Sequence, residues 1–367
     1  MLIAALSGRA PAAAALRAGY APLVADLFGD EDMRVAVCGS ERTRGDLEAG
    51  LDEESLLETL ARMAEGQHCI GVVCGSGFED RPGLLERIAA RWPLLGNDAA
   101  TVRRAKDPFG LAALCGELGV PHPEVAETRP ADSRGWLRKR IGGSGGTHVQ
   151  PADQCRSQAE EVYYQRRVAG RAVSALFLAN GEEALLVGLS AQWSNPKHDA
   201  GARYGGAVRP AGIGRPLARR LRRHLAPLSR ALGLRGLNSA DFLVGRGEYW
   251  LLEINPRPGA TLDLFDCPAA PLFALHLDAC RGALPARAPR QRGAAAVAIA
   301  YATREIAHMP RLDWPVWCAD RQTAGSRLRE GDPICSVAAK ALSSETARGL
   351  VETRIRTVLG LAQGRVN

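Results

Sequence analysis

The chain has 367 residues, of which 46% are hydrophobic and 24% are charged, and its formal net charge is +7. This length is too great for one ordinary hydrophobic core, so we expect two or three compact units. No stretch reaches the ~20 apolar residues of a membrane span, and Gly8, Arg9 and Pro11 interrupt the N-terminal apolar run, which no basic leader precedes. We therefore expect a cytoplasmic protein without a membrane partner.

The positive charge does not by itself predict a nucleic-acid partner. The densest basic segment, residues 215–235, carries leucines at helical spacing. We interpret it as an amphipathic helix, kinked at Pro227, whose arginines form a solvated face without interleaved aromatic residues. Only four of the 47 basic residues are lysines, and two of these, Lys106 and Lys139, lie in the motifs described below.

The first 95 residues alternate between short apolar runs and helical segments. Such alternation predicts a parallel sheet flanked by helices. Two short loops that follow strand ends, residues 7–9 and 75–77, are candidate contributors to a ligand site. The predicted strands lie at residues 2–6, 23–26, 35–38 and 69–74, and predicted helices at residues 9–19, 52–65 and 82–91.

From about residue 96 the pattern changes. A helix is predicted at residues 107–118, followed by strand-like segments and glycine-rich loops to about residue 265. The chain is again β-like from residue 294 and ends in a helix at residues 344–360. Together these patterns predict an α/β fold that becomes α+β in the second half of the chain.

A basic strand runs into a loop that contains four glycines. Lys139 lies on the strand, and Gly142, Gly143, Gly145 and Gly146 follow it. Glycines let backbone N–H groups approach an anion closely, and Lys139 adds a point charge, so the segment predicts a phosphate-binding hairpin. It is not a Walker A loop, because no Gly-Lys-Ser/Thr sequence opens a helix. A hairpin without a ligand is the alternative.

An acidic hairpin is predicted about a hundred residues later. Two β-rich runs flank a glycine-containing turn at residues 245–248. Glu253 and Asn255 are two apart on the second run and share a face, while folding back at the turn brings Asp241 beside Glu253. These oxygen ligands suit Mg²⁺, and Arg257 beyond the strand is a candidate to hold the transferred phosphoryl group or an oxyanion. A solvated strand face is the alternative.

The order of these motifs resembles the ATP-grasp superfamily. Residues 252–257, Leu-Glu-Ile-Asn-Pro-Arg, are similar to the signature of biotin carboxylase-type members. Residues 103–107 and 118–123 are similar to the segment that carries the first ATP-contacting lysine, here Lys106. The β-rich tail, which includes residues 314–317, resembles the C-terminal domain of predicted ATP-dependent carboligases.

The resemblance implies a three-part architecture. Residues 1–95 would form a Rossmann-like pre-ATP-grasp domain. Residues 96–282 would form an ATP-grasp domain of two α+β subdomains, with the glycine-rich loop at 142–147 and the magnesium hairpin at 238–257. Residues 290–367 would form a small β-rich C-terminal domain with a terminal helix.

The resemblance also implies roles for residues at matching positions. Lys139 and Arg257 would be catalytic, and ATP and Mg²⁺ (or Mn²⁺) would be the cofactors. An adenine strap is implied at residues 163–170, although many members carry acids at the place of Arg166 and near Val173. The residues implied in ATP binding are Lys106, Lys139, Gly142, Gly143, Ser144, Gly145, Gly146, Thr147, Tyr164, Gln165, Arg166 and Val168, and those implied in metal binding are Asp241, Glu253 and Asn255.

The resulting hypothesis is an ATP-dependent carboxylate–amine ligase, which activates a carboxylate as an acyl phosphate and couples it to an amine. Its partners would be small-molecule carboxylate and amine substrates without nucleic acid, and a homodimer is compatible with it. Some relatives belong to one-carbon carrier pathways that use methanofuran or tetrahydromethanopterin, which suggests one-carbon cofactor biosynthesis. Two alternatives stay open: a carboxylase or kinase with the same ATP site, and a non-catalytic nucleotide-binding protein.

The sequence says less about the substrates themselves. Residues 192–206 include a long polar loop, and loops of this length are often functional, so this segment is a candidate lining of the acceptor pocket. His148 and His198 are candidate bases, with an exposed or structural role as the alternative.

Overall fold

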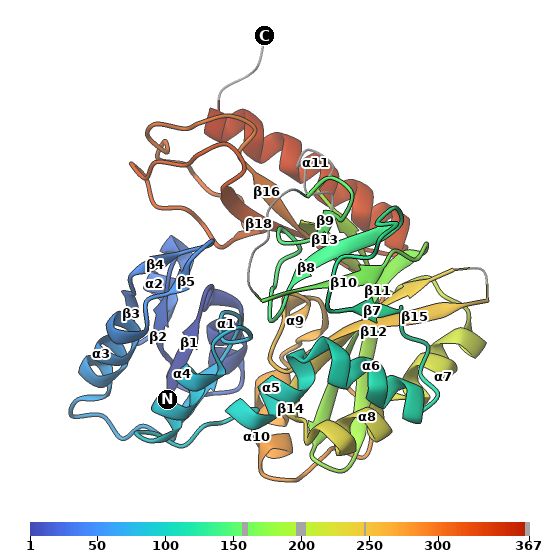
Figure 1. The fold of residues 1–367 in the computed structure, drawn as a ribbon. Helices are drawn as coiled ribbons and strands as arrows, with labels where there is room; N and C mark the ends of the chain where they lie inside the picture. The colour runs from blue at the N-terminus through green and yellow to red at the C-terminus, as the bar shows by residue number, and fades with distance from the viewer. Residues whose placement is uncertain (156–160, 196–202, 246, 364–367) are drawn as a thin grey trace.

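The computed structural model describes residues 1–155, 161–195, 203–245 and 247–363. It has a mixed α/β fold, and its first part is a sheet of four parallel strands in the order β3-β2-β1-β6 (Figure 1, blue). Helices pack on this sheet, as the alternating pattern predicts. The elements are β1 (Leu2–Ala5), α1 (Arg9–Arg17), β2 (Leu23–Asp26), α2 (Glu31–Ala36), β3 (Gly39–Arg42), β4 (Gly45–Asp46), β5 (Gly50–Leu51), α3 (Glu53–Ala64), β6 (Val72–Cys74) and α4 (Pro82–Ala89).

The predicted strand at residues 35–38 is wrong. Helix α2 covers residues 31–36, and the strand that pairs with β2 begins only at Gly39. Glu31 and Asp32 occupy the first turn of α2, where acidic side chains complement the helix dipole. Asp32 also accepts hydrogen bonds from the backbone N–H groups of Asp320 and Arg321, at 3.2 and 2.9 Å, so a distant segment fixes this helix.

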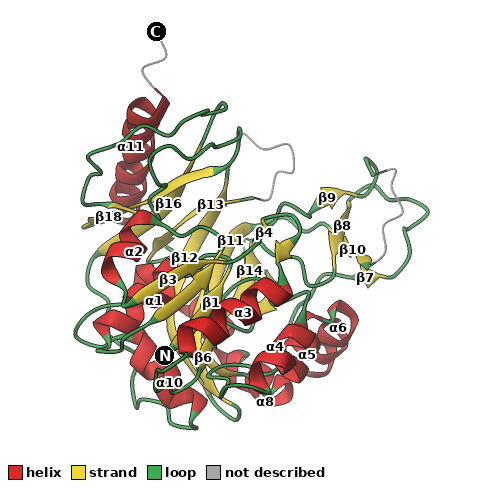
Figure 2. Ribbon diagram, turned by 90° about the vertical axis from the view of Figure 1, so that its left-hand side faces the viewer, coloured by secondary structure: helices red, strands yellow, loops and turns green. Residues whose placement is uncertain are grey.

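A small antiparallel sheet protrudes at the right of Figure 2. Its strands lie in the order β7-β10-β8-β9. Two short helices precede it in the chain and lie below it in that view. The bounds are α5 (Ala99–Lys106), α6 (Pro108–Glu117), β7 (Val125–Ala126), β8 (Trp136–Arg140), β9 (Gln150–Pro151) and β10 (Val162–Arg166).

A large antiparallel sheet of eight strands forms the centre, in the order β15-β14-β11-β12-β13-β16-β18-β17. It is continuous across residues 283–293, because β16 pairs with β13. The division of the chain into three domains stays a prediction. The strands are β11 (Arg171–Asn180), β12 (Ala184–Ser194), β13 (Tyr204–Arg209), β14 (Arg235–Val244), β15 (Tyr249–Asn255), β16 (Ala294–Tyr301), β17 (Cys318–Ala319) and β18 (Pro333–Ala341).

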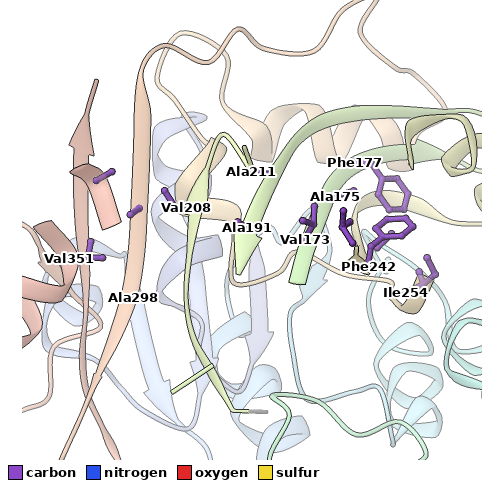
Figure 3. Close-up of a cluster of buried hydrophobic side chains, with 14 of the residues drawn as sticks. Val173, Ala175, Phe177, Ala191, Val208, Ala211, Phe242, Ile254, Ala298 and Val351 are labelled. Atoms are coloured by element: carbon purple, nitrogen blue, oxygen red, sulfur yellow. The ribbon is translucent and has the colours of Figure 1, made fainter. Parts of the chain in front are cut away.

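Helices cover both faces of the large sheet. One face contributes Val173, Ala175 and Phe177 to a core that also includes α7, α8 and α11 residues (Figure 3). The opposite face contributes Leu176 and Leu178 to a core shared with α1, α9 and α10. The helices are α7 (Arg215–Arg223), α8 (Leu225–Leu232), α9 (Leu262–Phe265), α10 (Leu272–Cys280) and α11 (Ser344–Gln363). None of the helices described is both long and apolar enough to span a membrane.

The helical segment at residues 215–232 is interrupted before Pro227, and not at Pro227 as predicted. The helix breaks at His224, between α7 and α8, and Pro227 is the third residue of α8. Backbone N–H groups in the first turn of a helix have no intrahelical acceptor, so proline is tolerated there.

Candidate active site

Lys106 is placed by the junction of two helices. It is the last residue of α5, and the next residue, Asp107, caps α6. The Lys106 side chain is only 6% exposed. Its Nζ donates to Glu253 Oε2 at 3.2 Å and to Asn255 Oδ1 at 2.8 Å. The Lys106 ammonium group is therefore hydrogen-bonded to two of the three predicted metal ligands.

The acidic hairpin has the predicted register. Asp241 on β14 is directly paired with Glu253 on β15, which confirms that the chain folds back as expected. Asn255 Nδ2 donates to Asp241 Oδ2 at 2.9 Å, and this bond turns the oxygen of the Asn255 amide toward Lys106. Asp241 Oδ1 is buried and forms no hydrogen bond of standard geometry among the described residues, although the Ser174 hydroxyl on the paired strand is close enough to lower the pKa of Asp241.

The two carboxyl groups of the hairpin differ in their electrostatic surroundings. Burial, together with the negative charge of Glu253, raises the pKa of Asp241 to about 6. Burial would also raise the pKa of Glu253, but the ammonium groups of Lys106 and Lys139 outweigh it and lower that pKa. Two adjacent carboxylates repel each other, and a cation bound between them would offset that repulsion.

The glycine-rich loop packs against the first part of the chain. Gly142 has φ +70°, and a Cβ atom there would lie 2.7 Å from the backbone oxygen of Glu79 and the Cα of Asp80. A Cβ on Gly143 would lie 2.6 Å from the His148 ring. A side chain at either position would therefore push the loop out of place, so the loop needs glycine at both.

Lys139 is buried beneath this loop, on the pocket side of β8. Its Nζ donates to Gln165 Oε1 on β10 at 2.7 Å, and burial lowers its pKa. Its partner is a neutral amide, so the attraction of the Lys139 ammonium for an incoming anion is not cancelled by a direct ion pair.

One pocket brings the two hairpins together. Lys106, Lys139 and Glu253 line it, together with Gly142, Gly143 and Gly146 of the loop. The space between these residues is about 570 Å³ when the open solvent at its mouth is included. The glycine-rich loop and Glu253 of the acidic hairpin, about a hundred residues apart in sequence, therefore face one cleft, whereas Asp241 and Asn255 are not among the residues that line it.

The residues of the predicted adenine strap that lie on β10 point to two different faces of that strand. Gln165 lines the pocket together with Tyr163, the first residue of the implied strap. Tyr164 and Arg166 alternate to the other face of β10, and the Arg166 guanidinium lies 5.6 Å from the centre of the Trp136 ring. Tyr163 and Gln165 share a face because they are two apart on the strand, and Tyr163 pairs with Lys139. Contacts of Tyr164, Arg166 and Val168 with a nucleotide stay a prediction. The backbone groups of these residues would have to make them.

Glu79 is a site residue that the sequence pattern did not indicate. It follows the predicted loop at residues 75–77, and its Oε1 accepts a hydrogen bond from Arg257 Nε. Its Oε2 accepts the backbone N–H groups of Gly77 and Phe78, at 2.7 and 3.0 Å. Burial would raise the pKa of Glu79, but the charges of Arg257 and Lys106 lower it to about 2. The first part of the chain thus holds Arg257 beside the acidic hairpin.

The remaining candidates fall in different places. His148 lines the pocket, and burial lowers its pKa to about 4, so the ring is neutral near pH 7. Arg9 lies in ion pairs with Asp263 and Asp320, outside the residues that line this pocket. Residues 196–202, with His198, lie outside the described residues.

The metal-ligand set is small. Among residues 1–155, 161–195, 203–245 and 247–363, no group of three His, Cys, Asp or Glu side chains is arranged for a metal ion. The candidate set is instead two carboxylates, Asp241 and Glu253, and the amide oxygen of Asn255. Hard Mg²⁺ accepts such mixed oxygen ligands and usually completes its octahedron with phosphate or water, so these residues fit the ion.

Comparison with known proteins identifies the class. Residues 109–261 match a family model described as an ATP-grasp domain. The chain therefore contains an ATP-grasp domain, which confirms the resemblance seen in the sequence.

Individual relatives are distant. The chain is 25% identical over 240 residues to the carbamoyl phosphate synthase large chain of Deinococcus radiodurans, which covers 57% of this chain and 23% of the relative. The chain thus spans about a quarter of that relative's length. It is 25% identical over 265 residues to a D-alanine–D-alanine ligase of Desulforudis audaxviator, which covers 70% of this chain and 83% of that enzyme.

The fold is shared with solved structures. The biotin carboxylase domain of Hydrogenobacter thermophilus 2-oxoglutarate carboxylase, in complex with MgADP, ADP and bicarbonate, matches with a TM-score of 0.74. The match covers 97% of this chain and 89% of that one at 10% identity. At this identity the likeness concerns the fold alone.

Proposed function

We propose that this protein is an ATP-dependent ligase that activates a carboxylate as an acyl phosphate and couples it to an amine. One observation carries the proposal: the glycine-rich loop with Lys139 and the Glu253 side of the acidic hairpin line a single pocket. The match to an ATP-grasp domain supports it, as does the similarity to a D-alanine–D-alanine ligase.

Asp241, Glu253 and Asn255 would hold Mg²⁺, and Mn²⁺ would fit the same oxygen ligands. Bound to ATP, the metal would supply positive charge against the phosphate oxygens during transfer. Asp241 Oδ1 supports this assignment, because it is buried and forms no hydrogen bond of standard geometry, even with the Ser174 hydroxyl on the paired strand.

The protein's own groups would then position the reactants. A carboxylate resists attack because it would have to expel an oxide, and phosphorylation turns that oxygen into a good leaving group. Lys139 would stabilise the transferring phosphoryl group, and Arg257, held by Glu79, would stabilise the oxyanion. The glycine-rich loop, resting on residues 79–80, would keep water from the acyl phosphate until the amine attacks.

The proposal names the two substrates only by chemical class, as a carboxylic acid and an amine. The resemblance of the β-rich tail to predicted carboligases makes one-carbon cofactor biosynthesis the pathway to test first. Amines and acids of that chemistry therefore belong in the substrate panel, beside the common amino acids. A homodimer likewise stays a prediction.

The acyl phosphate step is tested with an acid labelled with ¹⁸O in its carboxylate. The protein is incubated with Mg²⁺, ATP, a panel of labelled acids and hydroxylamine, which traps acyl phosphates as hydroxamates. We expect ADP, a hydroxamate, and released phosphate that carries one ¹⁸O from the acid. Release of AMP, or phosphate without label, would contradict this route, and Glu253→Gln is the control without activity.

A further inference from the structure

The candidate metal site already holds a positive charge. Lys106 Nζ contacts Glu253 Oε2 at 3.2 Å and Asn255 Oδ1 at 2.8 Å. The Asn255 amide cannot turn away from it freely, because its nitrogen donates to Asp241 Oδ2 at 2.9 Å. Lys106 therefore binds oxygens of two of the three predicted ligands.

An ammonium group and a metal ion cannot share these oxygens. Mg²⁺ binds oxygen at about 2.0–2.1 Å, so an ion on the Asn255 and Glu253 oxygens would lie against Nζ. Two cations at contact distance repel strongly where water screens little. The Lys106 side chain is 6% exposed and the Glu253 side chain is 40% exposed, so water screens this repulsion only from the Glu253 side.

Lys106 has room to leave without a change of fold. Its backbone is fixed, because α5 ends there and Asp107 accepts the N–H of Phe109 at 3.0 Å to cap α6. Its flexible side chain lines the same pocket as Lys139 and the glycine-rich loop. A triphosphate in that pocket would attract the ammonium away from the carboxylates.

We propose that Lys106 is an internal counter-ion that occupies the divalent-cation position of the nucleotide-free protein and withdraws when a nucleoside triphosphate binds. This inference rests on the proposed function, since it concerns the metal of that reaction. It makes metal binding depend on nucleotide, and by linkage each ligand tightens the binding of the other by the same factor. The protein would then not hold a divalent cation in advance of its nucleotide.

The test is a titration with Mn²⁺, followed by electron paramagnetic resonance, with and without a non-hydrolysable ATP analogue. In the wild type we expect weak binding of Mn²⁺ to the protein alone and strong binding with the analogue, after subtraction of the Mn²⁺ that the analogue binds in a protein-free sample. Lys106→Met removes the charge and keeps most of the side chain, so it should tighten nucleotide-free Mn²⁺ binding by at least about tenfold. The enhancement by the analogue should shrink correspondingly.

Three controls make the result specific. Lys139→Met removes a charge from the same pocket without touching the ligand oxygens, so it should give a smaller gain. Adding Asp241→Asn to Lys106→Met should abolish the new Mn²⁺ binding if the ion is at this site. Lys106→Gln repeats the measurement should the methionine variant fold poorly, as judged by circular dichroism.

The two hypotheses fail separately. If the wild type binds Mn²⁺ with the analogue, and Asp241→Asn abolishes this binding, the proposed site stands. In that case, unchanged Mn²⁺ affinity in both Lys106 variants, or an equal gain in Lys139→Met, overturns the counter-ion role alone. If the wild type shows no analogue-dependent Mn²⁺ binding, the proposed function itself is contradicted.

Discussion

Replacing Lys139 with methionine is expected to slow acid-dependent ADP formation on the order of 100- to 1000-fold without unfolding the protein. The lysine is buried under the glycine-rich loop, and its ammonium donates a hydrogen bond to the neutral amide of Gln165. Its charge is therefore available to a phosphate, and burial already lowers its pKa. Removing this charge should raise the activation free energy of the reaction more than it lowers the free energy of unfolding. The measurement is a coupled ADP assay beside a thermal unfolding curve.

The chain offers a matched control for this variant. Lys340 is another of its four lysines, and it lies exposed on β18. Lys340→Met should leave both the rate and the unfolding temperature unchanged. Lys139→Arg should not restore activity, because the planar guanidinium does not fit where a compact ammonium sits. Full activity in Lys139→Met would refute the assignment of this residue.

Replacing Glu79 with glutamine is expected to destabilise the protein by about 3–5 kcal/mol, because it breaks a buried ion pair and leaves one charge behind. The side chains of Arg257 and Glu79 are 15% and 4% exposed. Glutamine also supplies only one acceptor oxygen, whereas Glu79 accepts from Arg257, Gly77 and Phe78 with two. Activity should fall as well, since Arg257 loses its support. Urea unfolding followed by circular dichroism measures the first effect.

A double variant separates stability from chemistry. Adding Arg257→Met to Glu79→Gln removes the uncompensated charge, so it should recover much of the stability while activity stays low. The control is Glu86→Gln, which breaks the exposed pair with Arg103 and should leave the unfolding midpoint unchanged. If Glu79→Gln is as stable and active as the wild type, Glu79 does not hold Arg257 in the way described.

Local patterns predicted the parts of the site that lie close together in sequence. The two-residue spacing of Glu253 and Asn255 and the turn before them were enough to bring Asp241 beside Glu253, and the strand pairing confirms it. The glycine-rich loop was likewise visible as a run of glycines after a basic strand. Period-two alternation is a property of any strand, so these predictions needed no knowledge of the whole fold.

Residues that act through long-range contacts could not be found in this way. Glu79 and Arg257 are 178 positions apart, and nothing near either one indicates the other. The position of Lys106 on the acidic hairpin depends on how α5 packs against β15, which the sequence pattern does not specify. Helix α2 was missed because its short apolar run also fits a strand, and its contacts with Asp320 and Arg321 come from the far end of the chain.

The central claim is that a metal-bound triphosphate lies between the glycine-rich loop and the acidic hairpin. A crystal structure of the protein with Mg²⁺ and a non-hydrolysable ATP analogue tests it most directly. The account predicts phosphates against residues 142–147 and Lys139, a metal ion on Asp241, Glu253 and Asn255, and Lys106 withdrawn from those oxygens. A nucleotide bound outside this cleft, or a metal ion that contacts none of the three ligands, would contradict it.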